Sequence, residues 1–174
     1  MVDTFGKTDI GSDGQTGGNT SDYVFGWKYT LPENGYVTKI TTYFQIGSAS
    51  GGNYRCLIYD SSNNLKGETT ARNWGSSKAF SWEDFVFASP LYLTAGDYWL
   101  CLFMDNNSSA YTLIKYDNGD ANQAAYDTVA WNGAPNPVSW DGYWARAGSI
   151  YATYTTPKPV ASSLTIIMQK LGMM

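Results

Sequence analysis

Apolar and polar residues alternate with a period of two through much of the chain, which is the spacing of half-buried β-strands. The clearest case is a stretch in which Tyr23, Phe25, Trp27 and Tyr29 alternate with Val, Gly, Lys and Thr. Such an aromatic stripe is typical of the inner face of a β-sandwich, and an exposed binding face is the alternative. We therefore expect a strand over residues 23–31 whose rings enter a core.

Turn signals separate this strand from further segments of the same kind. Pro32-Glu33-Asn34-Gly35 is one of them, because Pro fixes φ and Asn-Gly tolerates positive φ. The expected strands cover residues 23–31, 36–46, 54–59, 65–71, 80–87 with a continuation at 91–93, 98–104, 110–116 and 149–155. The spacing changes phase between Trp82 and Phe85, which predicts a β-bulge. About eight antiparallel strands, with no helix before the tail, predict an all-β jelly-roll sandwich.

The remaining segments lie outside this pattern of strands. Residues 1–21 are polar and Gly-rich and predict an N-terminal coil arm before the sandwich of residues 22–155. Residues 117–147 read as a long Trp-rich insertion loop within the sandwich, and residues 156–174 as a Pro linker followed by an apolar anchor.

The C-terminal arm has the pattern of a short amphipathic helix. Its apolar residues fall at i, i+3, i+4 and i+7, namely Leu164, Ile167, Met168 and Leu171. A helix this short is unstable alone in water and needs a surface to cover its apolar face. Three interpretations stay open: docking onto its own sandwich, anchoring to another subunit, or an extended arm that adds a strand.

Charge and composition exclude several classes of protein. The 174 residues are 43% hydrophobic, which excludes a disordered chain, and only 15% are charged, with a net charge of −4. The eleven Lys and Arg residues are scattered, so nucleic-acid binding is not expected. No apolar stretch is long enough for a membrane span. Residues 1–14 lack the apolar run of a secretory signal, so we expect either a removed signal or release by another route, such as cell lysis.

The side chains offer little for catalysis. The chain contains no His, the commonest general base, and twelve Asp but only three Glu. Nearly all the Asp residues stand beside Gly, Asn or Ser in turns, where Asp usually bonds local backbone. We therefore expect no enzyme activity and no required cofactor. Asp117 and Asp120 flank Asn-Gly and are candidate Ca²⁺ ligands, with ordinary turn chemistry as the alternative.

The two cysteines, Cys56 and Cys101, each stand in the middle of an apolar strand. Two buried free thiols are one interpretation, since Cys is among the most buried residues. A disulfide between neighbouring strands is the other, and the sequence does not decide between them.

Aromatic residues in predicted loops are the most informative candidates for a binding site. Trp131, Trp140, Tyr143 and Trp144 stand in the insertion beside Asp141, and Trp74 stands in another loop. One interpretation is a platform for a glycan or a protein partner, because sugar C–H faces stack on rings while polar groups bond hydroxyls. The other is a small core within the loop itself.

Several motifs resemble a jelly-roll module found in tailed-virus structural proteins and in extracellular proteins of bacteria and archaea. They are Phe5-Gly6-Lys7-Thr8, Tyr23-Val24-Phe25-Gly26-Trp27-Lys28-Tyr29-Thr30-Leu31-Pro32, Gly35-Tyr36-Val37-Thr38-Lys39-Ile40, Arg55-Cys56-Leu57-Ile58-Tyr59-Asp60 and Ser89-Pro90-Leu91-Tyr92-Leu93-Thr94-Ala95-Gly96-Asp97-Tyr98-Trp99-Leu100. The resemblance covers roughly residues 5–155. Its motifs are mostly core and turn residues, so they indicate fold better than function.

The resemblance implies a domain that binds sugars or decorates virions, with no catalytic residues. We expect a non-enzymatic structural protein of the virion surface, a capsid decoration or a fibre head, whose jelly roll can bind cell-surface glycans. Its expected partners are a capsid or tail lattice or further copies of itself. The alternative is a carbohydrate-binding module of a secreted extracellular protein.

Overall fold

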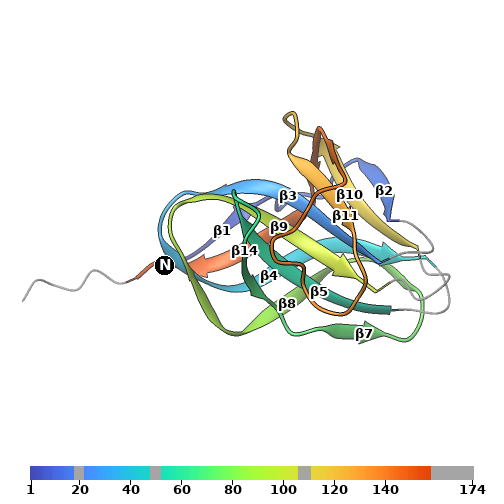
Figure 1. The fold of residues 1–174 in the computed structure, drawn as a ribbon, viewed down its shortest axis with the longest axis horizontal. Coiled ribbons are helices and arrows are strands. Elements are labelled where there is room, and N and C mark those ends of the chain that lie inside the picture. The colour runs from blue at the N-terminus through green and yellow to red at the C-terminus, as the bar shows by residue number, and fades with distance from the viewer. Residues whose placement is uncertain (18–21, 48–51, 106–110, 158–174) are drawn as a thin grey trace, which may run out of the picture.

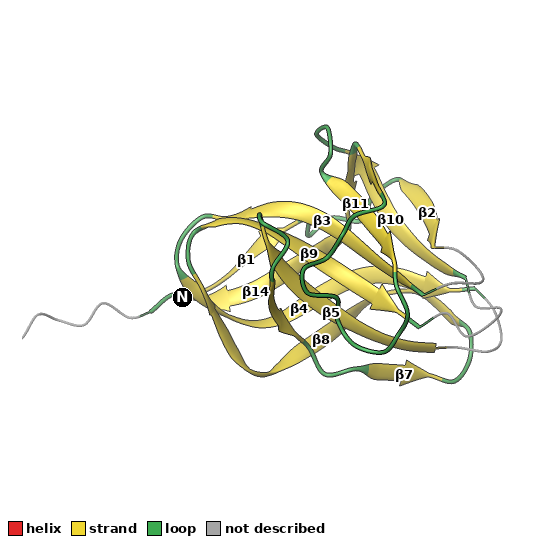
Figure 2. Ribbon diagram, viewed as in Figure 1, coloured by secondary structure: helices red, strands yellow, loops and turns green. Residues whose placement is uncertain are grey.

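The computed structural model describes residues 1–17, 22–47, 52–105 and 111–157, and within them the protein is built from strands and loops (Figure 2). The strands form two antiparallel sheets that pack face to face. Sheet A contains β1 (Val2–Gly6), β2 (Asp13–Gly17), β4 (Gly35–Ile46), β8 (Lys78–Leu93), β10 (Thr112–Asn118), β13 (Arg146–Gly148) and β14 (Ile150–Thr155). Sheet B contains β3 (Tyr23–Leu31), β5 (Gly52–Asp60), β6 (Leu65–Glu68), β7 (Arg72–Trp74), β9 (Gly96–Met104), β11 (Ala124–Thr128) and β12 (Gly142–Trp144).

The central strands follow the order of a jelly roll. Sheet A runs β1-β14-β4-β8 and sheet B runs β3-β9-β5-β6, so the chain repeatedly crosses from one sheet to the other. Figure 1 shows the two layers and the adjacent first and last strands. The predicted all-β sandwich is confirmed. The predicted number of strands is wrong, because the described residues contain fourteen rather than eight.

The additional strands lie where the sequence predicted coil and loop. The expected coil arm over residues 1–21 contains β1, which pairs with β14, and β2, which pairs with β10. The insertion over residues 117–147 contains the end of β10, all of β11 and β12 and the first two residues of β13. These strands are short and rich in Gly, Asp and Ala, so they lack an alternating apolar signal. Pairing with longer strands, rather than their own sequence, sets their conformation.

The core lies between the two sheets and confirms the interpretation of the aromatic stripe. Phe25 and Trp27 are almost fully buried in it, and Tyr23 and Tyr29 pack against its rim. The indole of Trp27 reaches from sheet B to the backbone of Gly148 in sheet A, with no room for a β-carbon between them. This close approach joins β13 to the central sandwich.

Both cysteines are free thiols. Cys56 belongs to the core between the sheets, whereas Cys101 belongs to a second cluster on the outer face of sheet B. Their strands are neighbours, but Cys56 stands opposite Leu102 and Cys101 opposite Leu57. Because successive side chains of a strand point to opposite faces, the two sulfur atoms lie on opposite sides of the sheet. Burial raises the pKa of each thiol, which keeps both protonated at neutral pH.

The expected bulge between Trp82 and Phe85 is absent, because β8 pairs with β4 without interruption over these residues. Irregularities fall instead between Val37 and Lys39 and between Phe44 and Ile46. The spacing of Trp82 and Phe85 arises because they belong to opposite faces: Phe85 is fully buried in the core, and Trp82 lies on the outer face of sheet A.

No helix long and apolar enough to cross a membrane occurs in the portion of the chain that the structure describes. The proposed anchor, with Leu164, Ile167, Met168 and Leu171, lies outside the described residues, and its role stays a prediction.

Candidate functional site

The outer face of sheet B is covered by the chain itself. A second buried cluster lies on this face, and residues 129–141 pack over it as a loop that we call the sheet B cover. The loop crosses in front of β9 and β5 (Figure 1). The buried members of the cluster are Val24, Leu57, Tyr59, Trp99, Cys101, Phe103, Ala125 and Val138. The cover therefore adds a small third layer to the sandwich.

Trp131 holds one end of this cover against the sheet. Its ring centre lies 4.5 Å from that of Phe103, and the Arg55 guanidinium stands 4.5 Å above the Trp131 ring. Arg55 also forms an ion pair with Glu68 at 2.8 Å. The ring is thus held between an aromatic and a cationic partner, a favourable arrangement for an indole.

Trp140 holds the other end. Its ring centre lies 5.0 Å from that of Trp99, and its indole N–H donates a hydrogen bond to Oδ1 of Asn63 at 3.1 Å. The same ring covers Gly26, where even a β-carbon would come within 2.8 Å of it. Gly26 therefore leaves a place in β3 that the indole fills.

The other predicted aromatic residues are also largely occupied. Trp144 stacks on Tyr126, with ring centres 4.6 Å apart, and belongs to the rim of the core. Trp74 makes an edge contact with Tyr54 at 5.5 Å at the side of the sandwich. Tyr143 alone of the predicted rings is well exposed, at 48%. This geometry favours the loop-core interpretation for the tryptophans.

Asp141, the predicted polar partner of those rings, instead supports the loop. Its Oδ2 accepts a hydrogen bond from the backbone N–H of Thr128 at 2.9 Å. It also lies near Asp127, whose pKa is raised first by burial and then by the charge of Asp141. Asp127 in turn accepts a backbone hydrogen bond from Ser139. Both carboxylates therefore bind backbone of the cover and its base.

Asp117, the first predicted Ca²⁺ ligand, binds Lys7 and Ser12 instead. Its Oδ2 forms an ion pair with Nζ of Lys7 at 2.8 Å, and its Oδ1 accepts hydrogen bonds from both the N–H and the hydroxyl of Ser12. These contacts tie the segment between β1 and β2 to β10. Within the described residues, no group of three or more His, Cys, Asp or Glu side chains is placed to hold a metal.

We expect Lys7→Met to raise the pKa of Asp117 from about 2 towards its ordinary value of 3.8, because the hydrogen bond from Lys7 is the largest cause of the depression. A depressed carboxyl pKa stabilises the fold above the unfolded-state value and loses that effect as the pH falls through the folded-state value. The variant should therefore lose this contribution at a higher pH. A carboxyl NMR titration measures it, with Ser12→Ala as the comparison, which should produce the smaller rise.

Asp120, the second predicted Ca²⁺ ligand, lines an open polar hollow of about 470 Å³ at the end of sheet B. The hollow is lined by Lys28, Tyr29, Thr30, Asp97, Asp120, Ala121, Asn122 and Gln123. Gln123 shapes it, since its Oε1 accepts the backbone N–H of Asp120 at 2.9 Å. Asp97 is already engaged by the Thr30 hydroxyl at 2.6 Å. The lining is mostly polar, and Tyr29 is the one aromatic residue in it.

Among the residues that the structure describes, no loop packs over the outer face of sheet A as the cover does over sheet B, and this face carries a row of four aromatic rings. Tyr43 and Phe80 lie with ring centres 5.4 Å apart, Tyr43 and Trp82 5.2 Å, and Trp82 and Tyr151 5.4 Å. All four rings are partly exposed. Within the described chain none of them contacts an aromatic ring outside this series. We call this series, in the order Phe80, Tyr43, Trp82, Tyr151, the aromatic row.

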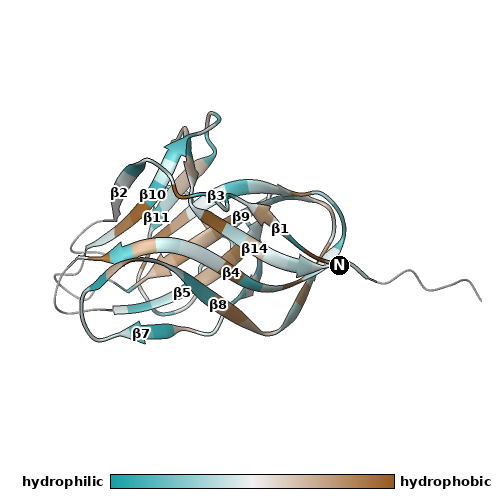
Figure 3. Ribbon diagram, turned by 180° about the vertical axis from the view of Figure 1, so that it is seen from behind, coloured by the Kyte–Doolittle hydropathy of each residue, from teal (hydrophilic) through white to brown (hydrophobic). Residues whose placement is uncertain are grey.

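The strand register explains how the row forms. Tyr43 of β4 stands opposite Trp82 of β8, and Tyr151 of β14 stands opposite Thr41 of β4. Thr41 lies between Tyr151 and Asp84 in the sheet and is only 2% exposed although it faces outwards. Figure 3 turns this face, with β14, β4 and β8, towards the viewer.

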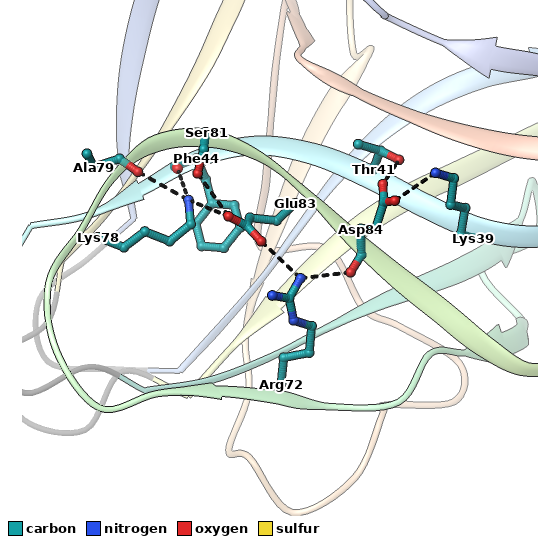
Figure 4. A network of polar contacts seen from close by, with 9 residues as sticks. All are labelled: Lys39, Thr41, Phe44, Arg72, Lys78, Ala79, Ser81, Glu83 and Asp84. Carbon is teal, nitrogen blue, oxygen red and sulfur yellow. Dashed lines mark hydrogen bonds and ion pairs between the residues drawn. The ribbon is translucent and has the colours of Figure 1, made fainter.

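Polar groups border the aromatic row. Oδ2 of Asp84 binds Nζ of Lys39 at 2.7 Å, and its Oδ1 accepts a hydrogen bond from the Thr41 hydroxyl at 2.6 Å (Figure 4). Burial opposes ionisation of Asp84, but these two bonds, together with the positive charges of Lys39 and Arg72, outweigh it and hold its pKa below the ordinary value. At the other end of the row, the Lys115 ammonium lies 5.4 Å from the Phe80 ring centre.

A second polar network lies at the adjacent edge of the sandwich and has a structural role. Arg72 of β7 binds Glu83 of β8 at 3.0 Å and also the backbone carbonyl of Asp84 (Figure 4). Lys78 pairs with Glu83 at 3.4 Å while it lies over the Phe44 ring. These charges join a strand of sheet B to a strand of sheet A, so they close the core between the sheets.

Sequence reasoning missed the aromatic row, although one signal pointed to it. The phase change at Trp82 and Phe85 placed an aromatic residue on each face of one strand. Tyr43 and Tyr151 gave no such signal, because their proximity to Trp82 depends on strand order and register. Residues far apart in sequence become neighbours only once the sheet is assembled.

Comparisons with known proteins add no family to this description. The chain matches no family model, no curated protein and no solved structure. The motif resemblance to jelly-roll modules therefore remains an expectation.

Proposed function

We propose that this protein is a non-enzymatic jelly-roll domain that binds glycans through the aromatic row and is displayed on the surface of a virus particle. The observation that carries the glycan part is the partly exposed aromatic row on sheet A, on the side of the sandwich opposite the sheet B cover. Soluble proteins seldom leave contiguous rings uncovered unless the rings bind something.

The chemistry of this face suits a saccharide. A pyranose has apolar C–H faces that stack on rings and a rim of hydroxyl groups that needs hydrogen-bond partners. The row supplies the rings, and Lys39 with Asp84 supplies donors and acceptors beside them. Because these two charges pair with each other, the face has no strong field to attract nucleic acid.

The acidic groups favour binding over catalysis. A glycosidase needs one carboxyl with a raised pKa as its general acid. Asp84, which borders the row, has a lowered pKa instead. The carboxyl with a raised pKa, Asp127, belongs to sheet B and binds backbone there.

Display on a virus particle, as a capsid decoration or fibre head, rests on the resemblance of the sequence motifs. Its partners would be a capsid or tail lattice or further copies of the chain. The alternative setting is a carbohydrate-binding module of a secreted protein, which would use the same face. Mass spectrometry of purified particles from the source organism separates the two: peptides of this chain at stoichiometric levels support the virion setting, and their absence contradicts it.

We expect Trp82→Ala to weaken glycan binding at least about thirtyfold, the effect of losing a central aromatic contact worth roughly 2 kcal/mol. Trp82 lies in the middle of the row and contacts the rings on both sides. A glycan array identifies the bound sugars, and titration calorimetry with one of them measures the loss.

The matched control for this experiment is Tyr92→Ala. Tyr92 is an exposed tyrosine, at 47%, on the same strand, but its ring pairs with Tyr36 rather than with the row. It should leave the affinity unchanged, and circular dichroism should show both variants folded. An array without hits, or equal affinities for the Trp82 variant and the parent, would rule out this site.

A further inference from the structure

The polar hollow at the end of sheet B has the form of a ligand site and shares no residue with the aromatic row. It has a volume of about 470 Å³ and lies between the end of β3 and the turn that joins β10 to β11. Pockets for small molecules typically have volumes of about 300–1,000 Å³. The hollow therefore has room for a small ligand, and the chemistry of its lining indicates which kind.

Hydrogen bonds hold the two walls of the hollow together. The backbone N–H of Lys28 donates to the carbonyl of Gln123 at 2.8 Å, and the Gln123 amide donates a longer bond of 3.4 Å to the Lys28 carbonyl. Within the turn, the backbone N–H of Gln123 bonds the Asp120 carbonyl at 3.1 Å. The walls are thus in place before a ligand arrives, which lowers the entropic cost of binding.

The edge of β3 presents backbone groups to this side of the sheet. β11 pairs with β3 only as far as the pair of Ala124 and Trp27. Beyond it, the N–H and C=O of Lys28 point towards the turn, and those of Thr30 point the same way because alternate residues of a strand share a direction. No strand of the described chain pairs with β3 on that side at Thr30. The backbone therefore offers one donor and one acceptor beside the hollow.

The side chains of the lining add charged groups of both signs. The Lys28 ammonium lies 4.6 Å from the centre of the Trp99 ring and has no carboxylate partner among the described residues. The Asp120 carboxylate likewise has no ion pair or hydrogen bond there, and Asp97 uses only one oxygen, on the Thr30 hydroxyl. Donors and acceptors around one hollow suit hydroxyl groups, because each hydroxyl both donates and accepts.

The same charges argue against a metal ion or a strongly charged ligand. Lys28 would repel a cation, and Asp97 and Asp120 would repel an anion. Within the described residues, no third acidic side chain joins the two carboxylates to complete a metal site. A neutral ligand that carries several hydroxyl groups fits the lining best.

Tyr29 adds an apolar surface to the hollow. Its hydroxyl donates to the carbonyl oxygen of Gly148 at 2.6 Å, which fixes the ring where it lines the hollow. None of the ring–ring contacts within the described chain involves Tyr29. Such a ring can pack against the C–H groups of a sugar while the polar groups bond its hydroxyls.

We infer that the polar hollow is a second binding site, which holds one neutral sugar unit of a glycan. Lys28 from β3 and Asp120 from the turn bond its hydroxyl groups, the backbone of Thr30 bonds a further one, and Tyr29 packs against its C–H groups. The site goes beyond the proposed function, because it works without any residue of the aromatic row.

Amide NMR of the full chain, titrated with the methyl glycosides of glucose, galactose, mannose and N-acetylglucosamine, tests this inference. At least one sugar should shift the amide signals of Thr30 and Asn122 in a saturable way. Lys28→Met and Asp120→Asn should each weaken that binding at least about tenfold, since each removes hydrogen bonds to a charged group. The control Asp9→Asn makes the same change at an exposed carboxylate outside the hollow and should leave the affinity unchanged.

The same titrations separate the polar hollow from the aromatic row. Shifts at the hollow that persist in Trp82→Ala and disappear in Asp120→Asn support the inference, even if the row binds nothing. Shifts at the row alone, with none at the hollow for any of the four sugars, would overturn it and leave the proposed function standing. Unchanged affinity in both hollow variants, or a response to CaCl₂ or glucosamine at lower concentration than to every neutral sugar, would overturn it as well.

Discussion

Replacing Gly148 with alanine should destabilise the fold by about 3 kcal/mol, at the upper end of the usual cost of overpacking a core. A β-carbon at this position would lie 2.3–2.5 Å from three atoms of the Trp27 indole. Trp27 is 1% exposed and has no space to move into, because Phe25 stacks beside it and β13 lies against it. Chemical denaturation of the purified protein measures the change.

The control for Gly148 is another strand glycine. Gly14 lies in β2, and a β-carbon added there would meet nothing within 4 Å, so Gly14→Ala should change stability by less than about 0.5 kcal/mol. Adding Trp27→Phe to Gly148→Ala should recover part of the lost stability, because the smaller ring leaves room for the added β-carbon. Equal denaturation midpoints for the two alanine variants would contradict the close contact of Trp27 with Gly148.

The central sandwich was predictable because its signal is local. Each of the eight predicted strands has a counterpart in the structure, and residues 23–31 form β3 with the boundaries that the aromatic alternation gives. Alternation works here because one face of each long strand enters the core. Glycines, prolines and asparagines at the turns then separate one strand from the next.

The short outer strands were not predictable for the opposite reason. β1 has only Phe5 as a buried residue, and β13 is the three-residue segment Arg146–Gly148. Such segments become strands because a longer strand offers unpaired backbone groups beside them. The sequence of such a segment does not reveal its partner strand, so its composition alone predicts coil.

For the two candidate surfaces, too, the sequence shows which aromatic residues are present but not where the fold places them. A concentration of Trp in the insertion is visible in sequence, but whether those rings face solvent or the sheet depends on β5 and β9, more than twenty residues away. The aromatic row requires β4, β8 and β14 to be placed in order and register. Aromatic residue type therefore identified candidates, and topology decided which of them remain available to a ligand.

Trp140→Ala should destabilise the protein by about 3 kcal/mol, because it removes a ring that acts as core for the sheet B cover. The indole contacts Trp99, fills the place above Gly26 and donates a hydrogen bond to Asn63. Its loss should also admit water to the second cluster, which increases binding of a hydrophobic dye. Denaturation midpoints and dye fluorescence measure the two effects.

Tyr143→Ala distinguishes a structural role from a ligand-binding one. Tyr143 stands three residues from Trp140, is 48% exposed and approaches Trp99 only at 6.4 Å, so its loss should cost less than about 1 kcal/mol. If the loop were a ligand platform rather than a core, the Trp140 variant would keep its stability and lose glycan binding instead. Under the arrangement described above, Trp140→Ala unfolds more easily, whereas the row on the opposite sheet keeps its affinity at temperatures where the variant is folded.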